Sequence, residues 1–167
     1  TFSTVSVATF DMGTNALLVN TVSHSGTLLT QNLSASPIST GKTWGGLVNY
    51  NATAAQTAMA GTYNNLTISS GDAVAGGSDG ATASGNITVN GVLTLAAANA
   101  SATKGALEMV TSYGDYPRTT AENIYVPITS HTLTMGANAT TIGQGDVTGK
   151  IYRSSLSANT PYTFGSQ

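Results

Sequence analysis

The stretch ITVNGVLTL at residues 87–95 alternates apolar and polar residues on both sides of an Asn-Gly pair. This alternation predicts β-strands with one buried face, because successive side chains of a strand point to opposite sides. An Asn-Gly pair suits a two-residue hairpin, but it also suits a corner between two strand segments. A wider recurrence along the chain favours the corner.

Short apolar motifs of this kind return every 17 to 21 residues along the chain. One strand motif in each period of about twenty residues is typical of a solenoid, in which each repeat buries its apolar face against its neighbours. We therefore predict an all-β protein, a parallel β-helix of about nine coils of roughly nineteen residues, formed by one segment over residues 1–167. The leading apolar residues, expected to form one core column, are Phe10, Leu28, Leu47, Leu66, Ile87, Leu107, Ile124, Ile142 and Tyr162.

The composition excludes several functions. Charged residues make up 7% of the chain, against about 25% in an ordinary soluble domain. The five basic residues are scattered, so no positive stripe is available to contact a nucleic acid. The absence of cysteine removes disulfides and cysteine-based metal sites. No window approaches the roughly 18 consecutive apolar residues of a transmembrane helix. We expect no nucleic-acid partner and no transmembrane segment.

The chain begins at Thr1, without a methionine, and the apolar pattern runs to both ends. We interpret the chain as part of a longer polypeptide or fibre. Adjacent repeats or like subunits would then stack end to end, because uncapped strand edges favour further pairing.

The segment at residues 69–85 is rich in Gly and Ser, and we predict that it forms a flexible loop. Asp72 and Asp79 flank its Gly-Gly pair and are weak candidates for Ca²⁺ ligands, since calcium sites are built from loop oxygens. The alternative is a solvated glycine-rich loop. His24 and His131 are far apart in the sequence and have no ligand-type partners at metal-site spacing. We expect no metal other than Ca²⁺ and no organic cofactor.

Residues 111–121 concentrate aromatic and charged side chains. Tyr113, Asp115, Tyr116 and Arg118 are therefore candidates for a ligand or partner surface, although an ordinary excursion from a coil would look the same. With Glu108 and Glu122, Asp115 and Arg118 also form the one local set of residues that resembles a carbohydrate-cleaving site. We predict no catalytic residues and no enzymatic activity.

The remaining aromatic residues and the threonines give weaker signals. Trp44, Tyr50, Tyr63, Tyr125 and Tyr152 could form a binding face, but aromatic residues in strands more often pack internally. Thr67 and Thr88 follow the leading apolar residue in their repeats. Other repeats place Asp, Leu, Val, Glu or Tyr at this position, so a threonine ladder of the ice-binding type is not predicted.

Several phrases resemble the repeats of giant cell-surface, adhesin-like proteins of the Bacteroidetes lineage. They are TFDMGTNAL at residues 9–17, GTYNNLTI at 61–68, GNITVNGVLTL at 85–95, GDVTGKIYR at 145–153 and YTFG at 162–165. The resemblance extends over nearly the whole chain, and it implies an exported, extracellular β-solenoid with no catalytic residues to transfer.

The leading functional hypothesis is therefore an exported structural or adhesive surface module, a stalk or adhesin repeat that contacts surface glycans or other cells. The alternative is a subunit of a homopolymeric extracellular filament. A polysaccharide-acting β-helix enzyme is the third and least favoured hypothesis.

Overall fold

The computed structural model describes residues 1–3, 8–71, 80–96, 106–116, 124–143, 146–148 and 150–153. Within these ranges the regular elements are all β-strands, and no helix is present. All the strand pairs are parallel except one, β12 with β13. The prediction of an all-β protein with parallel strands is confirmed.

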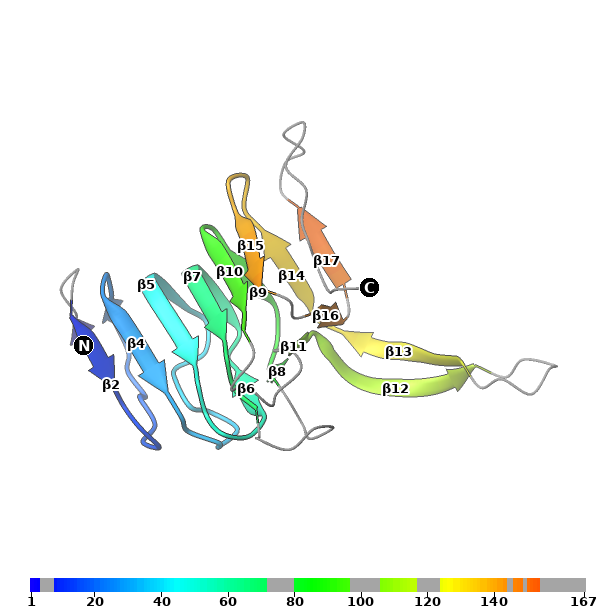
Figure 1. Ribbon diagram of the computed structural model, residues 1–167, viewed down its shortest axis with the longest axis horizontal. Helices are drawn as coiled ribbons and strands as arrows, with labels where there is room; N and C mark the ends of the chain where they lie inside the picture. Colours follow the sequence, from blue (N-terminus) through cyan, green and yellow to red (C-terminus); the bar gives the residue numbers. More distant parts are fainter. Residues whose placement is uncertain are drawn as a thin grey trace.

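The largest sheet is organised around two long strands, β5 and β7, which pair in parallel along most of their lengths (Figure 1). The first halves of these strands continue the ladder into β9, β14 and β17, and the second halves continue it into β4 and β2 on one side and β10 and β15 on the other. The strands of this sheet are β2 (Thr9–Asp11), β4 (Thr27–Thr30), β5 (Lys42–Tyr50), β7 (Gly61–Ile68), β9 (Ile87–Val89), β10 (Val92–Leu95), β14 (Thr132–Met135), β15 (Thr140–Gly143) and β17 (Lys150–Arg153).

The Asn90-Gly91 pair is a corner, as predicted. It separates β9 from β10, and both strands pair in parallel with β7, Ile87 opposite Gly61 and Leu93 opposite Leu66. Its glycine is required by close approach, because a Cβ on Gly91 would lie 2.7 Å from the carbonyl oxygen of Asn64. The Gly91 N–H donates a 2.6 Å hydrogen bond to that same oxygen.

Two smaller parallel ladders accompany the large sheet. At the N-terminal end, β1 (Phe2–Ser3) pairs with β3 (Val22–Ser23). The other ladder runs in the order β16, β11, β8, β6 and brings Leu107 between Ala81 and Val147. The chain enters this ladder after β5, β7, β10 and β15, but not after β2 or β4. Its strands are β6 (Gln56–Ala58), β8 (Ala81–Ala83), β11 (Ala106–Glu108) and β16 (Asp146–Thr148).

An antiparallel hairpin interrupts the parallel order. It consists of β12 (Val110–Tyr116) and β13 (Ile124–Ser130). In Figure 1 the hairpin extends away from the stacked strands as an arm. It is inserted between β11 and β14, so Ile124, which was predicted to be a core residue of one coil, pairs with Tyr116 within the arm.

Columns of like side chains fill the interior. Leu28, Val48, Leu66 and Leu93 are successive partners on the large sheet, and all four are fully buried. Parallel strands lie about 4.8 Å apart, so these side chains stack directly on one another. Full burial of each such residue contributes about 1.5–3 kcal/mol before entropy is subtracted. This column is one of the apolar columns that hold the strands together.

The first core column predicted from the sequence is correct only in part: Phe10, Leu28 and Leu66 lie on one ladder, and other predicted members do not. Leu47 lies one residue away from the column, where Val48 stands instead. Ile87 belongs to the other half of the sheet, next to Leu133, and Leu107 belongs to the β6–β16 ladder. One turn of the chain contains up to three strand segments, each in a different ladder. Residues at equal spacing in the sequence can therefore belong to different ladders. The ladder through Leu28 contains six strands, β2, β4, β5, β7, β10 and β15. The nine coils predicted from the sequence are therefore not confirmed.

The segment at residues 69–85 is partly strand. Ala81–Ala83 forms β8, and the Ser70 hydroxyl donates a 2.6 Å hydrogen bond to the carbonyl of Gly80. Gly80 has a φ of 91°, a value that favours glycine. Residues 72–79, including both predicted Ca²⁺ ligands, lie outside the described residues.

The corner of β5 provides a test of the close stacking. A bulge places Gly45 and Gly46 opposite the one residue Asn64, and a Cβ on Gly46 would overlap the carbonyl oxygen of Gly26. We expect Gly46→Ala to lower the free energy of unfolding by about 1–3 kcal/mol, measured by urea denaturation, because backbone atoms must shift.

The matched control is Asn64→Ala, which removes an exposed side chain at the facing corner and should change stability by no more than about 0.5 kcal/mol. Equal stability of Gly46→Ala and the parent chain would show that the corners are not closely stacked.

Candidate functional site

Three of the four predicted partner-binding residues lie on the projecting hairpin. Tyr113 pairs with Pro127, Asp115 with Tyr125, and Tyr116 with Ile124. The fourth residue, Arg118, lies outside the described residues. Directly opposed residues of an antiparallel pair are about 5 Å apart at Cα, so the hairpin brings Tyr125, on its second strand, next to Asp115 on its first.

The arm is attached at a narrow base. The N–H of His131, directly after β13, donates a 2.5 Å hydrogen bond to the carbonyl of Met109, directly before β12. Met109 is fully buried and anchors this base in the core. The arm therefore leaves and rejoins the scaffold at adjacent points, an arrangement in which a framework of paired strands presents a projecting segment.

The described residues contain no assembled metal or catalytic site, and the Ca²⁺ candidates Asp72 and Asp79 lie outside them. Among the described residues, no group of three or more His, Cys, Asp or Glu side chains is placed to hold a metal ion. Glu108 lies in β11, where it pairs with Thr82 and Thr148, whereas Asp115 lies on the arm. Glu122 lies outside the described residues.

Three aromatic residues form part of the core, which confirms the internal-packing interpretation for Trp44, Tyr50 and Tyr63. The two tyrosines close a hydrogen-bond ring around Met59. The Met59 N–H donates to the Tyr50 hydroxyl over 2.9 Å, and the Tyr63 hydroxyl donates to the Met59 carbonyl. The Tyr50 hydroxyl then donates to that of Tyr63 over 3.1 Å.

Burial of these two tyrosines disfavours the ionised form of both phenols. Burial raises the pKa of Tyr50 to about 12 and raises the pKa of Tyr63 well above its ordinary value, because a phenolate would be desolvated in the core. The ring satisfies a backbone N–H and a backbone carbonyl that have no place in a ladder at this point. These tyrosines are structural, whereas Tyr152 is 55% exposed.

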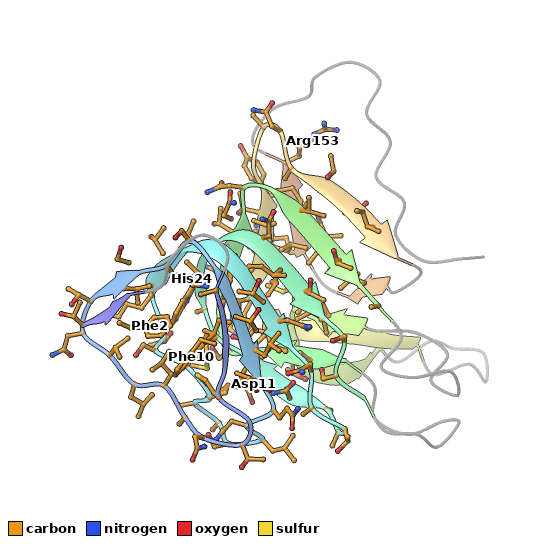
Figure 2. All side chains as sticks on the ribbon, turned by 60° about the vertical axis from the view of Figure 1, so that its left-hand side comes forward. Phe2, Phe10, Asp11, His24 and Arg153 are labelled. Carbon is orange, nitrogen blue, oxygen red and sulfur yellow. The ribbon has the colours of Figure 1, made fainter. Side chains whose placement is uncertain are left out.

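An aromatic cluster lies at the N-terminal end of the stack. Figure 2 shows Phe2, Phe10 and His24 close together at this end. The rings of Phe2 and Phe10 are 5.3 Å apart, and the His24 ring meets that of Trp44 at 5.6 Å in a T-shaped contact. His24 is only 6% exposed.

The hydrogen bonding of His24 defines its tautomer. The Gly46 N–H donates to Nδ1 over 3.2 Å, so the neutral ring carries its proton on Nε2, which has no hydrogen-bond partner. Burial lowers the pKa of His24, because the imidazolium would be desolvated among aromatic rings. His24 is therefore a packing residue whose protonated form is disfavoured in the folded chain.

The structure reveals a threonine column that the sequence comparison misses. Thr43, Thr62, Thr88 and Thr134 are successive partners, each between two inward positions of its strand. Thr67, which the sequence pattern grouped with Thr88, instead pairs with Asn49 and Thr94 on the other half of the sheet. The recurrent Thr at the second position of the first strand segment is the signal that could have identified this column.

Comparisons with known proteins return no match. No protein-family model matches the chain, and searches among curated proteins and among solved structures find none that match. In the part of the chain that the structure describes, no helix is long and apolar enough to cross a membrane.

From the burial of His24 we predict that the free energy of unfolding decreases at acidic pH. The pKa of His24 is lower in the folded chain than the ordinary value of 6.5, so the unfolded chain binds the proton first as pH falls. Its contribution to stability is therefore complete above about pH 6.5 and is lost progressively below it. We expect urea midpoints to decrease between about pH 7 and 5.

His24→Asn should flatten this dependence, because the amide oxygen can replace Nδ1 as acceptor without titrating. His131→Asn, the matched control, should retain it. A slope that persists in His24→Asn would assign the effect to another group.

The hydrogen-bonded ring of Tyr50, Tyr63 and Met59 makes a prediction for Tyr50→Phe: the variant should be less stable than the parent chain, and its stability should depend less on alkaline pH. Tyr50→Phe leaves the buried Met59 N–H without its acceptor and should cost about 1–3 kcal/mol in urea denaturation. Because the pKa of Tyr50 is raised from 10.0 to about 12, the parent chain should lose stability as pH rises from about 10 to 12. Tyr50→Phe should lose less over this range.

Tyr152→Phe removes an exposed hydroxyl and is the control, with an expected change below about 0.5 kcal/mol. If Tyr50→Phe and Tyr152→Phe lowered stability equally, the hydrogen bonds of the buried Tyr50 hydroxyl would not contribute to stability as described.

Proposed function

We propose that this chain is an exported, extracellular structural module without catalytic activity: a β-solenoid segment that serves as a stalk or adhesin repeat and presents the β12–β13 arm to a surface glycan or another cell. The observation that carries the proposal is the combination of a continuous parallel scaffold with one aromatic-rich hairpin projecting from it.

The scaffold suits a mechanical role. Its successive strands repeat the same backbone pairing, so stability grows with each added rung through contacts between nearest neighbours. The buried column from Leu28 to Leu93 provides cohesion along the stack. Aromatic residues that could have lined a binding cleft, Trp44, Tyr50 and Tyr63, are instead used to pack and hydrogen-bond the interior.

The arm suits recognition. Its two strands place Tyr113, Tyr116 and Tyr125 with Asp115 on one short ladder. Tyrosine combines an apolar ring with a hydroxyl, which makes it suitable for contacts with sugars and with protein surfaces. The narrow base at Met109 and His131 lets the arm vary without rearranging the stack.

A second candidate is a subunit of a homopolymeric filament, in which copies stack end to end. It is favoured by two residues at inward positions on opposite edges of the described sheet, Phe10 and Ile151, which are 42% and 40% exposed. Such edges favour the addition of a further strand. Rods longer than one chain in electron micrographs of the purified protein would favour this candidate.

The display function is tested by removing the arm. Because Met109 and His131 are hydrogen-bonded neighbours, a short Gly-Gly link can replace residues 110–130. The shortened chain should keep its β-sheet circular dichroism and cooperative unfolding. It should lose binding to the members of a panel of immobilised polysaccharides, or to whole cells, that the parent chain binds.

Tyr113→Ser/Tyr116→Ser in the full chain gives a milder version of the same test, with Tyr152→Ser as the control on the scaffold. Undiminished binding by the shortened chain would remove the arm from the proposal. Release of reducing sugar from any polysaccharide of the panel would overturn the non-enzymatic assignment.

A further inference from the structure

One inward position of the large sheet holds a charged residue. Lys42 begins β5 and is followed along its ladder by Gly61, Ile87 and Leu133, of which the last two are fully buried. The alternation along β5 agrees, since Lys42 is half-buried, Thr43 is exposed and Trp44 is fully buried. The aliphatic stem of Lys42 thus occupies a place that apolar side chains fill on later rungs.

The next rung adds no side chain. Gly61 faces Lys42 directly, and a Cβ there would lie 2.7 Å from the Lys42 carbonyl oxygen. Two successive rungs of this column therefore lack an apolar side chain. Lys42 also lines a cavity of about 310 Å³, a volume at the lower end of the range of small-molecule sites.

Half of the residues that line the cavity are apolar. Ile38 and Met59 are buried beneath it, so the apolar surface that a ligand can reach comes from Val19 and the exposed Leu18. The Ser39 hydroxyl is already used, because it accepts from the Val19 N–H over 2.6 Å and donates to the Val19 carbonyl over 3.0 Å. The apolar wall would accommodate a compact hydrocarbon or aromatic group.

The polar end of the cavity carries an uncompensated positive charge. The Lys42 ammonium donates a 2.9 Å hydrogen bond to the carbonyl of Asn20, which is uncharged. Among the described residues no carboxylate forms an ion pair with Lys42. An ammonium has three N–H donors, so two remain for a ligand, and the hydroxyls of Ser36 and Thr40 also line the cavity.

We propose that this cavity binds a small monoanion with a compact apolar body, such as a short branched or aromatic carboxylate. The carboxylate contacts the Lys42 ammonium, and the apolar body lies against Val19 and Leu18. A single cation, without the paired donors of an arginine, matches one negative charge better than a phosphate dianion. The site is independent of the β12–β13 arm.

The test uses phenylacetate as the probe and phenylacetamide as its neutral analogue of the same shape, titrated into the full chain. The methyl resonances of Leu18 and Val19, the apolar residues that a ligand can reach, report binding by NMR. Phenylacetate should shift both resonances with saturation, and phenylacetamide should bind at least about tenfold more weakly, since the charge-assisted hydrogen bond is lost. Added salt should weaken only the phenylacetate complex.

Lys42→Met keeps the aliphatic stem and removes the charge, and it should weaken phenylacetate binding at least about tenfold. Lys42→Arg should retain binding, which separates loss of charge from loss of structure. Lys150→Met, which removes an exposed lysine of β17, is the matched control and should bind normally.

Three results would overturn the proposal. They are the absence of saturable shifts with phenylacetate, equal affinity for phenylacetate and phenylacetamide, and an equal loss in Lys42→Met and Lys150→Met. If Lys42→Met does not fold, Lys42→Gln and Lys42→Arg decide the same question. None of these outcomes depends on the adhesive role of the arm.

Discussion

The parallel pairing of β5 with β7 is the constraint on which the rest of the structure depends. It joins Lys42 to Gly61 at one end and Tyr50 to Ile68 at the other, with the two-glycine bulge between them. The first halves of the two strands set the register for β9, β14 and β17, and the second halves set it for β4 and β10. Because side chains alternate along a strand, this one register determines which residues enter the core. The buried column, the corners and the tyrosine ring all follow from it.

The two features assigned functions are both departures from the repeated pairing. The β12–β13 arm is an antiparallel insertion into a parallel stack, and the cavity beside Lys42 lies where an inward column lacks apolar side chains. A regular stack satisfies its own hydrogen bonds and buries its own columns, so it offers few groups to a ligand. The scaffold can tolerate such departures because each rung depends mainly on its neighbours. Local irregularity can therefore evolve there without loss of the fold.

Much of the local structure could be predicted, whereas the long-range register could not. Alternation around Asn90-Gly91 predicted two strand segments and a corner, and aromatic residues such as Trp44 were expected in the core. The predicted column failed at Leu47, because burial alternates without interruption from Trp44 to Tyr50 and therefore places Val48 inward. The predicted column also failed at Ile124, because this residue pairs with Tyr116 in the β12–β13 hairpin. The spacing of apolar residues does not indicate that these two segments form a hairpin. Lys42 gave no signal as a candidate, since a lone lysine in a sequence resembles any surface residue.

By itself the sequence determined an all-β chain of short strands, parallel in repeated passes and joined by small-residue corners. These properties are local: they depend on alternation, on glycine at positions of close approach and on the scarcity of charge. Only the tertiary structure decided which strand segments share a ladder, that Thr43 stacks on Thr62, and that Lys42 faces inward beside a cavity. The physical reason is that a shift of one residue exchanges the two faces of a strand. Only the packing of distant segments against one another selects between the alternatives.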